Sequence, residues 1–152
     1  MKLKYKKAII LGGSKGIGRE ITKNLKKLSK ITISCSRKDI DTSKINSVKN
    51  FIKKHKSTDI LILNSGGPPP IDFKNLDEEL WLRYFKQLFL SYCMILQKIK
   101  INKGGYIFYI SSAIIKEPGS DLILSSSLRL AFSSVLKSLT DRLPHLDKVF
   151  YF

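Results

Sequence analysis

Apolar residues along the chain follow two spacings, short continuous runs and longer stretches in which they recur every three or four positions. The continuous runs predict buried β-strands over 6–11, 31–35, 59–63 and 106–110, with the start of another at 148–152. The recurring spacing predicts helices over 16–28, 44–55, 77–99 and 123–143. Strands that alternate with helices predict an α/β fold with a doubly wound parallel sheet, and 152 residues suffice for a single domain, 1–152.

The predicted helices carry apolar faces that should meet the core. We expect Ile17, Ile21, Leu25 and Leu28 to face inward from the first helix, and Ser43 to cap the second. Negative charge at 77–79 fits the positive end of the third helix dipole. Its apolar stripe is broader than one sheet face requires. The stripe consists of Trp81, Tyr84, Phe85, Leu88, Phe89, Tyr92, Leu96 and Ile99.

A glycine-rich turn joins the first strand to the first helix. Gly12 permits a sharp turn, Gly16 lets a phosphate approach bare backbone, and Gly18 lets the helix pack closely on the sheet. The first helix then offers its free N–H groups and positive dipole end to an anion. The turn predicts a nucleotide site formed by Gly12, Ser14, Lys15, Gly16, Ile17 and Gly18.

A second strand end has matching character. The strand at 59–63 runs into Asn64, Ser65 and Gly66 and then into Gly67 and the prolines at 68–70. Two buried strands that both end in small residues suggest one shared crevice at the carboxyl edge of the sheet. The three prolines force an extended segment, which we interpret as a crossover connection.

Together with Ser111 and Ser112 after the strand at 106–110, these motifs resemble the short-chain dehydrogenase/reductase family. Leu11 replaces the family's usual Thr before the glycine turn, and the family's Asn-Asn-Ala-Gly motif corresponds to 64–67. The resemblance implies a Rossmann-like fold, NAD(H) or NADP(H) as cofactor, and oxidoreductase activity on a small-molecule carbonyl or alcohol.

The end of the second strand favours NADP(H) over NAD(H). In nucleotide-binding sheets an acidic residue here would bind the ribose 2′-hydroxyl, whereas arginine suits a 2′-phosphate. The position holds Arg37, and Lys15 in the glycine turn adds a second cation. Asp41 matches the family's acidic segment beside adenine. The alternative interpretation is that both cations simply belong to a basic surface.

The chain departs from the family pattern in length and in one internal unit. Asp41 follows Lys38 almost directly, so the helix and strand that family members place there are missing, and the strand at 31–35 should be a sheet edge. The chain is also about a hundred residues shorter than a typical 250-residue α/β domain. We therefore expect a C-terminally truncated sheet, as in a trimmed member or a fragment of a longer reductase.

The catalytic positions depart further. Resemblance assigns Ser112 to the family serine, and the Tyr-x-x-x-Lys motif corresponds to Ser125 and Arg129. A serine hydroxyl holds its proton far more tightly than a phenol, whose pKa is about 10. Leu88 falls near the family's helix asparagine. Two functions stay open: an impaired or altered reductase that uses Ser112, Ser125 and Arg129, and a non-catalytic dinucleotide-binding or assembly subunit in which 125–127 serve only packing.

Charge and cysteine content add further expectations. The net charge of +16 favours an anionic ligand, but no nucleic-acid-binding motif accompanies it, so we expect no nucleic-acid partner. Cys35 and Cys93 lie in apolar contexts and predict no disulfide, and no metal-ligand spacing is present. Without a signal peptide or a membrane-length run we expect a cytoplasmic protein. The resemblance implies a homodimer or homotetramer through the 75–100 and 123–143 helices.

Overall fold

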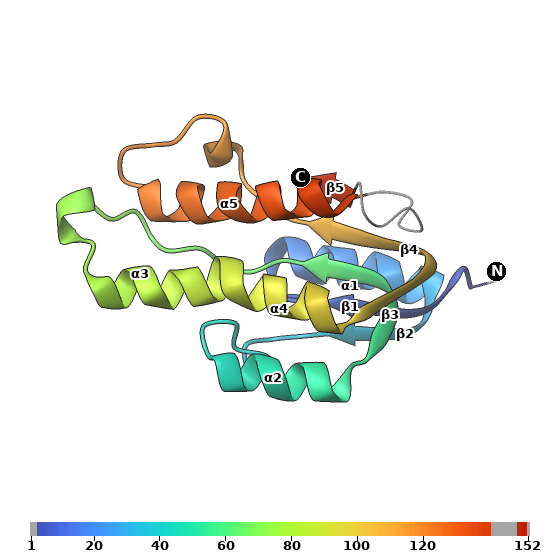
Figure 1. Cartoon of the computed structure of the whole chain (residues 1–152). Coiled ribbons are helices and arrows are strands. Elements are labelled where there is room, and N and C mark those ends of the chain that lie inside the picture. Colours follow the sequence, from blue (N-terminus) through green and yellow to red (C-terminus); the bar gives the residue numbers. More distant parts are fainter. Residues whose placement is uncertain (1–2, 141–148, 152) are drawn as a thin grey trace.

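The computed structural model describes residues 3–140 and 149–151, and Figure 1 shows strands alternating with helices along them. The elements in chain order are β1 (Tyr5–Ile10), α1 (Gly16–Leu28), β2 (Ser29–Ser34), α2 (Ile45–Lys54), β3 (Ser57–Leu63), η1 (Phe73–Asn75), α3 (Glu78–Phe85), η2 (Lys86–Leu90), α4 (Ser91–Lys98), β4 (Lys100–Tyr109), η3 (Ala113–Ile115), α5 (Ile123–Thr140) and β5 (Val149–Tyr151). Residues 141–143, 148 and 152, which belong to the predicted last helix and strand, lie outside the described residues.

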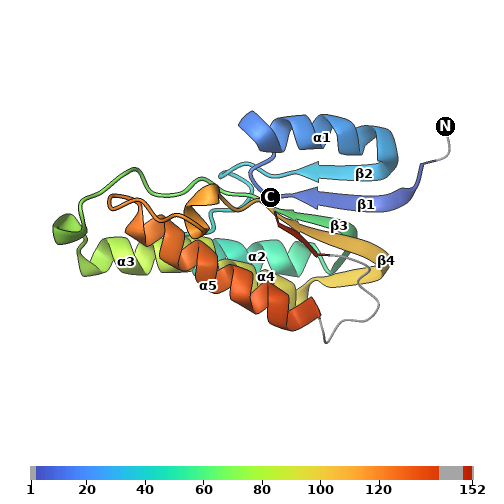
Figure 2. The ribbon, with the colours of Figure 1, turned by 90° about the horizontal axis from the view of Figure 1, so that it is seen from above.

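The strands form one parallel sheet in the order β2-β1-β3-β4-β5. Helix α1 covers one face, while α2, α4 and α5 lie on the other (Figure 2). This arrangement confirms the doubly wound α/β prediction. Among the described strands none pairs with the outer side of β2, so β2 is the expected edge. Ile10 is level with Ser34 and Ile62, so the carboxyl ends of β1, β2 and β3 meet at one edge.

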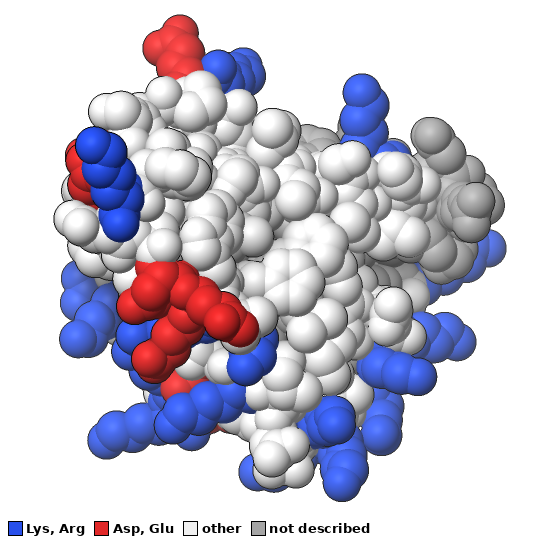
Figure 3. Space-filling view, turned by 60° about the vertical axis from the view of Figure 1, so that its left-hand side comes forward, with Lys and Arg blue, Asp and Glu red and all other residues white. Residues whose placement is uncertain are grey.

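Positive side chains are spread over the surface, as the sequence predicts. Residues 1–60 contain 17 Lys and Arg against 4 Asp and Glu, so this amino-terminal part carries most of the net charge of +16. In the described chain ion pairs join Glu20 to Arg19 and Lys23, and Asp41 to Lys44. Figure 3, which brings the α3 side of Figure 1 forward, shows a broad area free of charged side chains, bordered by basic groups and, on one side, by a cluster of acidic groups.

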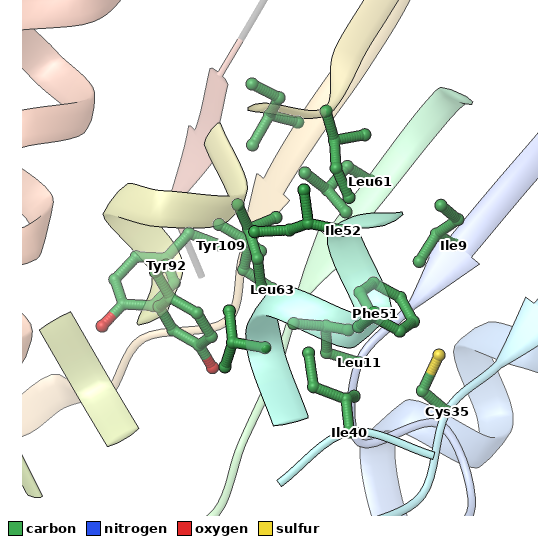
Figure 4. Packing of buried hydrophobic residues seen from close by; sticks show 14 of the residues in the cluster. Ile9, Leu11, Cys35, Ile40, Phe51, Ile52, Leu61, Leu63, Tyr92 and Tyr109 are labelled. Carbon is green, nitrogen blue, oxygen red and sulfur yellow. The ribbon is translucent and has the colours of Figure 1, made fainter. Parts of the chain in front are cut away.

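The main core lies between the sheet and the helices α2, α4 and α5 (Figure 4). Tyr92, Tyr109 and Phe132 are fully buried there, and their rings lie 4.9–6.0 Å apart, centroid to centroid. Cys35 is buried at the edge of this core, and burial raises the pKa of its thiol to about 12. Cys35 and Cys93 are both free, as predicted.

The predicted inward face of α1 is partly wrong. Ile17 is 64% exposed and Leu28 38% exposed, whereas Gly18, Thr22 and Leu25 form the buried side. A hydrophobic pattern gives no weight to a glycine, but here the helix lies so close to the glycine turn at Gly18 that a Cβ there would overlap the Gly12 carbonyl. The helix is therefore rotated from the orientation that apolar spacing suggests.

The predicted cap of α2 is also wrong. Lys44 is the N-cap residue and makes no side-chain capping bond. Ser43 instead donates its amide and hydroxyl to Asp41 Oδ1, at 3.0 and 2.7 Å. A short polar side chain such as that of Asp41 competes with the helix for nearby donors, and it turns Ser43 away from the helix end.

The long aromatic helix contains an unpredicted turn of π-helix. Asp77 caps α3 by accepting from the Leu80 amide at 2.8 Å, and η2 then separates α3 from α4. The wider turn shifts the phase of the side chains that follow it. Within this turn Gln87 and Leu88 are buried, while Phe85, just before it, is 38% exposed and stacks on Phe89.

At the amino edge of the sheet, Asp59 connects three segments. Its Oδ2 accepts from the amides of Lys6 and Lys7, and its Oδ1 accepts from Asn102 Nδ2 at 2.6 Å. Asn102 lies where β4 departs from regular register with β3. Burial works to raise the pKa of Asp59, but these hydrogen bonds outweigh burial and hold that pKa below its ordinary value.

We predict that Asp59→Ala lowers the free energy of unfolding by about 1–3 kcal/mol at pH 7, because two strand-edge amides and an asparagine lose their acceptor. A carboxylate with a lowered folded-state pKa stabilises the protein above its unfolded pKa of about 4, and this stability is lost as the pH falls through the folded pKa. Urea titrations at pH 7 and pH 3 should show the difference from wild type shrinking in acid. Exposed Glu117 provides the control, Glu117→Ala. An equal loss at both pH values would contradict the assigned role.

Candidate functional site

The glycine turn after β1 is built against the loop after β3. Gly12 has φ +62°, and Asn64 Nδ2 donates to its carbonyl oxygen at 3.3 Å. A Cβ at Gly18 would overlap that same carbonyl group. The turn, the amino end of α1 and the end of β3 are therefore in mutual contact.

The amino end of α1 is open on the side of this turn. Gly16 has φ +50°, and a Cβ at Gly16 would find no atom within 4 Å. Lys15 is the N-cap residue of α1 and provides no side-chain hydrogen bond. The first amides of a helix have no partners within the helix, so they are available to an anion here.

A cleft of about 810 Å³ lies over this helix end. It is lined by ten of the eleven residues predicted for cofactor binding: Gly12, Ser14, Lys15, Gly16, Ile17, Arg37, Asp41, Asn64, Ser65 and Gly66. Gly18 is not among the lining residues because it packs beneath the turn. The sequence analysis did not assign the other lining residues to cofactor binding; they are Leu11, Ser36, Lys38, Ile40, Thr42 and Gln87.

One corner of the cleft, after β2, is basic. Arg37 and Lys38 are exposed there, and Lys15 reaches the cleft from the glycine turn. The neighbouring acid, Asp39, accepts from the amide and the hydroxyl of Ser36, both at 2.7 Å. The carboxylate of Asp39 is therefore directed to its own turn, and these hydrogen bonds lower its pKa. The corner is thus suited to an anionic group.

Asp41 is the acidic side chain that lines the same cleft. Burial works to raise its pKa, but hydrogen bonds from Ser43 and the charges of Lys44 and Arg37 outweigh burial and lower it. Asp41 is therefore ionised at neutral pH and available as a hydrogen-bond acceptor at the cleft wall.

Three buried side chains hold the loop after β3. The Tyr92 hydroxyl donates to Ser65 Oγ at 2.7 Å, Gln87 Nε2 donates to the Gly66 carbonyl at 2.6 Å, and Arg129 Nη2 donates to the Ser65 carbonyl at 3.2 Å. Leu88, which falls near the family's helix asparagine, is apolar and fully buried, and the buried polar side chain beside it is Gln87, which the sequence analysis did not identify. The π-helical turn that positions Gln87 has no recognisable pattern in the sequence.

Ser125 and Arg129 are brought together, one turn apart on α5. Arg129 Nε donates to Ser125 Oγ at 3.2 Å. Both residues are buried, with Arg129 7% exposed and Ser125 4% exposed. Gly67 passes over the pair, since a Cβ at Gly67 would lie 3.1 Å from Ser125 Oγ. Neither residue lines the cleft.

Ser112 lies after β4 and precedes η3, whose first turn its side chain does not cap. The Ser112 carbonyl accepts a hydrogen bond from the Ile115 amide at 3.2 Å. Ser112 does not line the cleft and is not an acceptor of the Arg129 hydrogen bonds given above. The three predicted catalytic residues therefore do not form one group around the cleft. Among the described residues no group of three His, Cys, Asp or Glu side chains could hold a metal ion.

No protein-family model and no curated protein matches the chain. Solved structures do match it. One is the crystal structure of a small-chain dehydrogenase, with TM-score 0.81 and 20% identity over 96% of this chain and 81% of that chain. Another is the angucycline C-6 ketoreductase LanV with bound NADP, with TM-score 0.82 and 16% identity over 96% of this chain and 70% of the other.

A third match is a short chain dehydrogenase from Burkholderia cenocepacia J2315 in complex with NADP. Its TM-score is 0.77 at 18% identity, over 92% of this chain and 69% of that chain. At sequence identities this low, the three matches establish a shared fold and nothing more. In the described chain no helix is long and apolar enough to cross a membrane. The chain has the fold of the short-chain dehydrogenases/reductases, in a shorter form than these three structures.

Proposed function

We propose that the cleft binds a nicotinamide dinucleotide, with NADP(H) preferred over NAD(H). The observation that carries this proposal is the open, uncapped amino end of α1 between the glycine turn and a basic corner. The volume of about 810 Å³ lies within the range of about 300–1,000 Å³ that is usual for ligand sites. Matching structures described as bound to NADP support the same ligand class.

The residues present fit each part of such a cofactor. The backbone between Ser14 and Ile17 would hold the diphosphate, because no side chain fills the space at Gly16. Arg37, with Lys38 and Lys15, would hold a 2′-phosphate. Asp41 would accept from the adenosine half, and the loop at 64–66 would form the remaining wall.

As an enzyme, the protein would be a reductase of the short-chain dehydrogenase/reductase type acting on a small-molecule carbonyl or alcohol. A bound nicotinamide would supply or accept the hydride, and residues of this chain would have to supply the proton. Resemblance assigns Ser112, Ser125 and Arg129 to that chemistry. A serine would donate the proton weakly, and losing a general acid typically costs about 10²–10⁴-fold in rate.

The burial of Ser125 and Arg129 favours a second function, a non-catalytic dinucleotide-binding or assembly subunit. Both side chains are engaged with each other and with backbone carbonyls, and neither reaches the cleft. In this second function the glycine turn and the cleft keep their binding role while the reaction is absent. A truncated product of a longer reductase gene would behave in the same way.

Self-association is a further part of the proposal. Leu82 and Phe85 on α3 are 47% and 38% exposed, and Leu130 on α5 is 52% exposed. The uncharged area on the α3 side in Figure 3 is consistent with a protein-protein contact. We therefore propose a homodimer or homotetramer through the 75–100 and 123–143 helices.

Titration of the protein with NADPH, followed by nicotinamide fluorescence, tests the binding site. We expect saturable binding by wild type and at least about tenfold weaker binding by Gly16→Val, whose side chain would fill the phosphate cradle. Gly104→Val is the matched control, because Gly104 also has positive φ and open surroundings but lies in β4, away from the cleft. Wild type that shows no change at millimolar NADPH would contradict the proposal.

Cofactor preference depends on the basic corner. We predict that Arg37→Glu weakens NADPH binding by about tenfold or more while changing NADH binding by less than about threefold, because only NADPH carries the 2′-phosphate. Arg83→Glu alters an exposed arginine on α3 and should change neither affinity. Equal losses for both cofactors in Arg37→Glu would show that the corner contributes only general positive charge.

Sedimentation velocity at micromolar concentration measures the association state. We expect a dimer or larger species for wild type, and a shift towards monomer for Phe85→Glu, because a charge placed in an apolar contact must lose its hydration. Leu28→Glu, at a residue equally exposed at the end of α1, is the control and should leave the species unchanged. A wild-type monomer at this concentration would remove the proposed interface.

A further inference from the structure

Arg129 connects three separate parts of the fold through one guanidinium group. Its Nη2 donates to the Ser65 carbonyl at 3.2 Å, its Nη1 to the Ile110 carbonyl at 3.3 Å, and its Nε to Ser125 Oγ at 3.2 Å. Ser65 follows β3, and Ile110 follows β4. One helix side chain therefore ties together the carboxyl ends of two neighbouring strands.

The guanidinium is buried without an acidic partner among the described residues. Arg129 is 7% exposed, and the ion pairs of the described chain do not include it. Removing a charge from water is costly unless hydrogen bonds replace the lost hydration. The neutral oxygens that face Arg129 provide that replacement only while the two strand ends keep their present positions.

We propose that Arg129 is a positioning residue, which holds the cleft wall at Ser65 and Gly66 in the shape that binds the dinucleotide. This inference rests on the proposed cofactor site. The planar fork of arginine points its donors in several fixed directions, so it can reach three acceptors on different elements. A lysine ammonium at the same position is a single nitrogen and cannot bridge the three acceptors in this way.

The neighbouring contacts determine what losing Arg129 would change. The Tyr92 hydroxyl still holds Ser65 Oγ, and Gln87 still holds the Gly66 carbonyl. The Ser65 and Ile110 carbonyls, in contrast, would lose the donor that joins them. The effect should therefore be confined to the loop after β3 and the end of β4, while the glycine turn after β1 keeps its bond to Asn64.

The experiment compares wild type with Arg129→Lys and Arg129→Met, using the NADPH dissociation constant and hydrogen–deuterium exchange. We expect both variants to bind NADPH about tenfold more weakly, as for the loss of a charge-assisted hydrogen bond. Amide exchange should rise in peptides covering 64–67 and 110–112, and should stay unchanged over β1 and α1. Arg129→Lys keeps the positive charge and decides the question if Arg129→Met does not fold.

Two controls separate positioning from other roles. Ser127→Ala changes an exposed serine on the same helix whose hydroxyl bonds to the Leu124 carbonyl and not to Arg129, and it should bind NADPH within about twofold of wild type. Arg83→Met removes an exposed arginine and should change neither measurement. Wild-type affinity and exchange in Arg129→Lys would overturn the inference, as would faster exchange along the whole chain. Failure of wild type to bind NADPH would instead refute the proposed function, and the exchange measurement would still report on the loop.

Discussion

The close approach of Gly12, Gly18 and Asn64 is the contact on which the cleft depends. The Gly12 carbonyl lies where any side chain at Gly18 would have to be, and Asn64 donates a hydrogen bond to it. This packing brings the amino end of α1 to the carboxyl ends of β1 and β3 at one level of the sheet. A larger residue at either glycine position would separate the helix from the strands and remove the floor of the cleft.

The sequence predicts the parts of this arrangement that depend on local pattern. Buried apolar runs predicted the strands, and the glycines followed by a helix predicted the turn at the cleft, so ten of the predicted residues line it. Parallel strands end at a common edge, which is why Asn64 and Gly12 could be expected to meet despite their separation in the chain. The edge position of β2 followed from the missing helix and strand.

The features that were missed depend on packing between distant elements. Ile17 faces outward because a glycine, not an apolar residue, sets the contact of α1 with the sheet. Gln87 lies in a π-helical turn and Tyr92 just after it, and both donate hydrogen bonds to the loop after β3, a contact between elements far apart in the sequence. Ser43 illustrates a local competition, since its capping role is lost to Asp41.

The residues proposed for binding and those proposed for catalysis lie in different surroundings. The binding features, an open helix end and a basic corner, face the cleft, whereas Ser125 and Arg129 are enclosed by Gly67 and bonded to each other. Arg129 thereby contributes to the shape of the cleft from behind its wall. The proposed dinucleotide site and the proposed catalytic residues are thus separate in the structure, with Ser125 and Arg129 packed behind the loop that forms the cleft wall.

A crystal structure of the protein grown with NADPH would show whether the cleft holds the dinucleotide. We expect diphosphate density against the backbone amides between Ser14 and Ile17, with the 2′-phosphate beside Arg37. Well-ordered NADPH bound elsewhere on the molecule, with the amino end of α1 left in contact with solvent, would contradict this expectation.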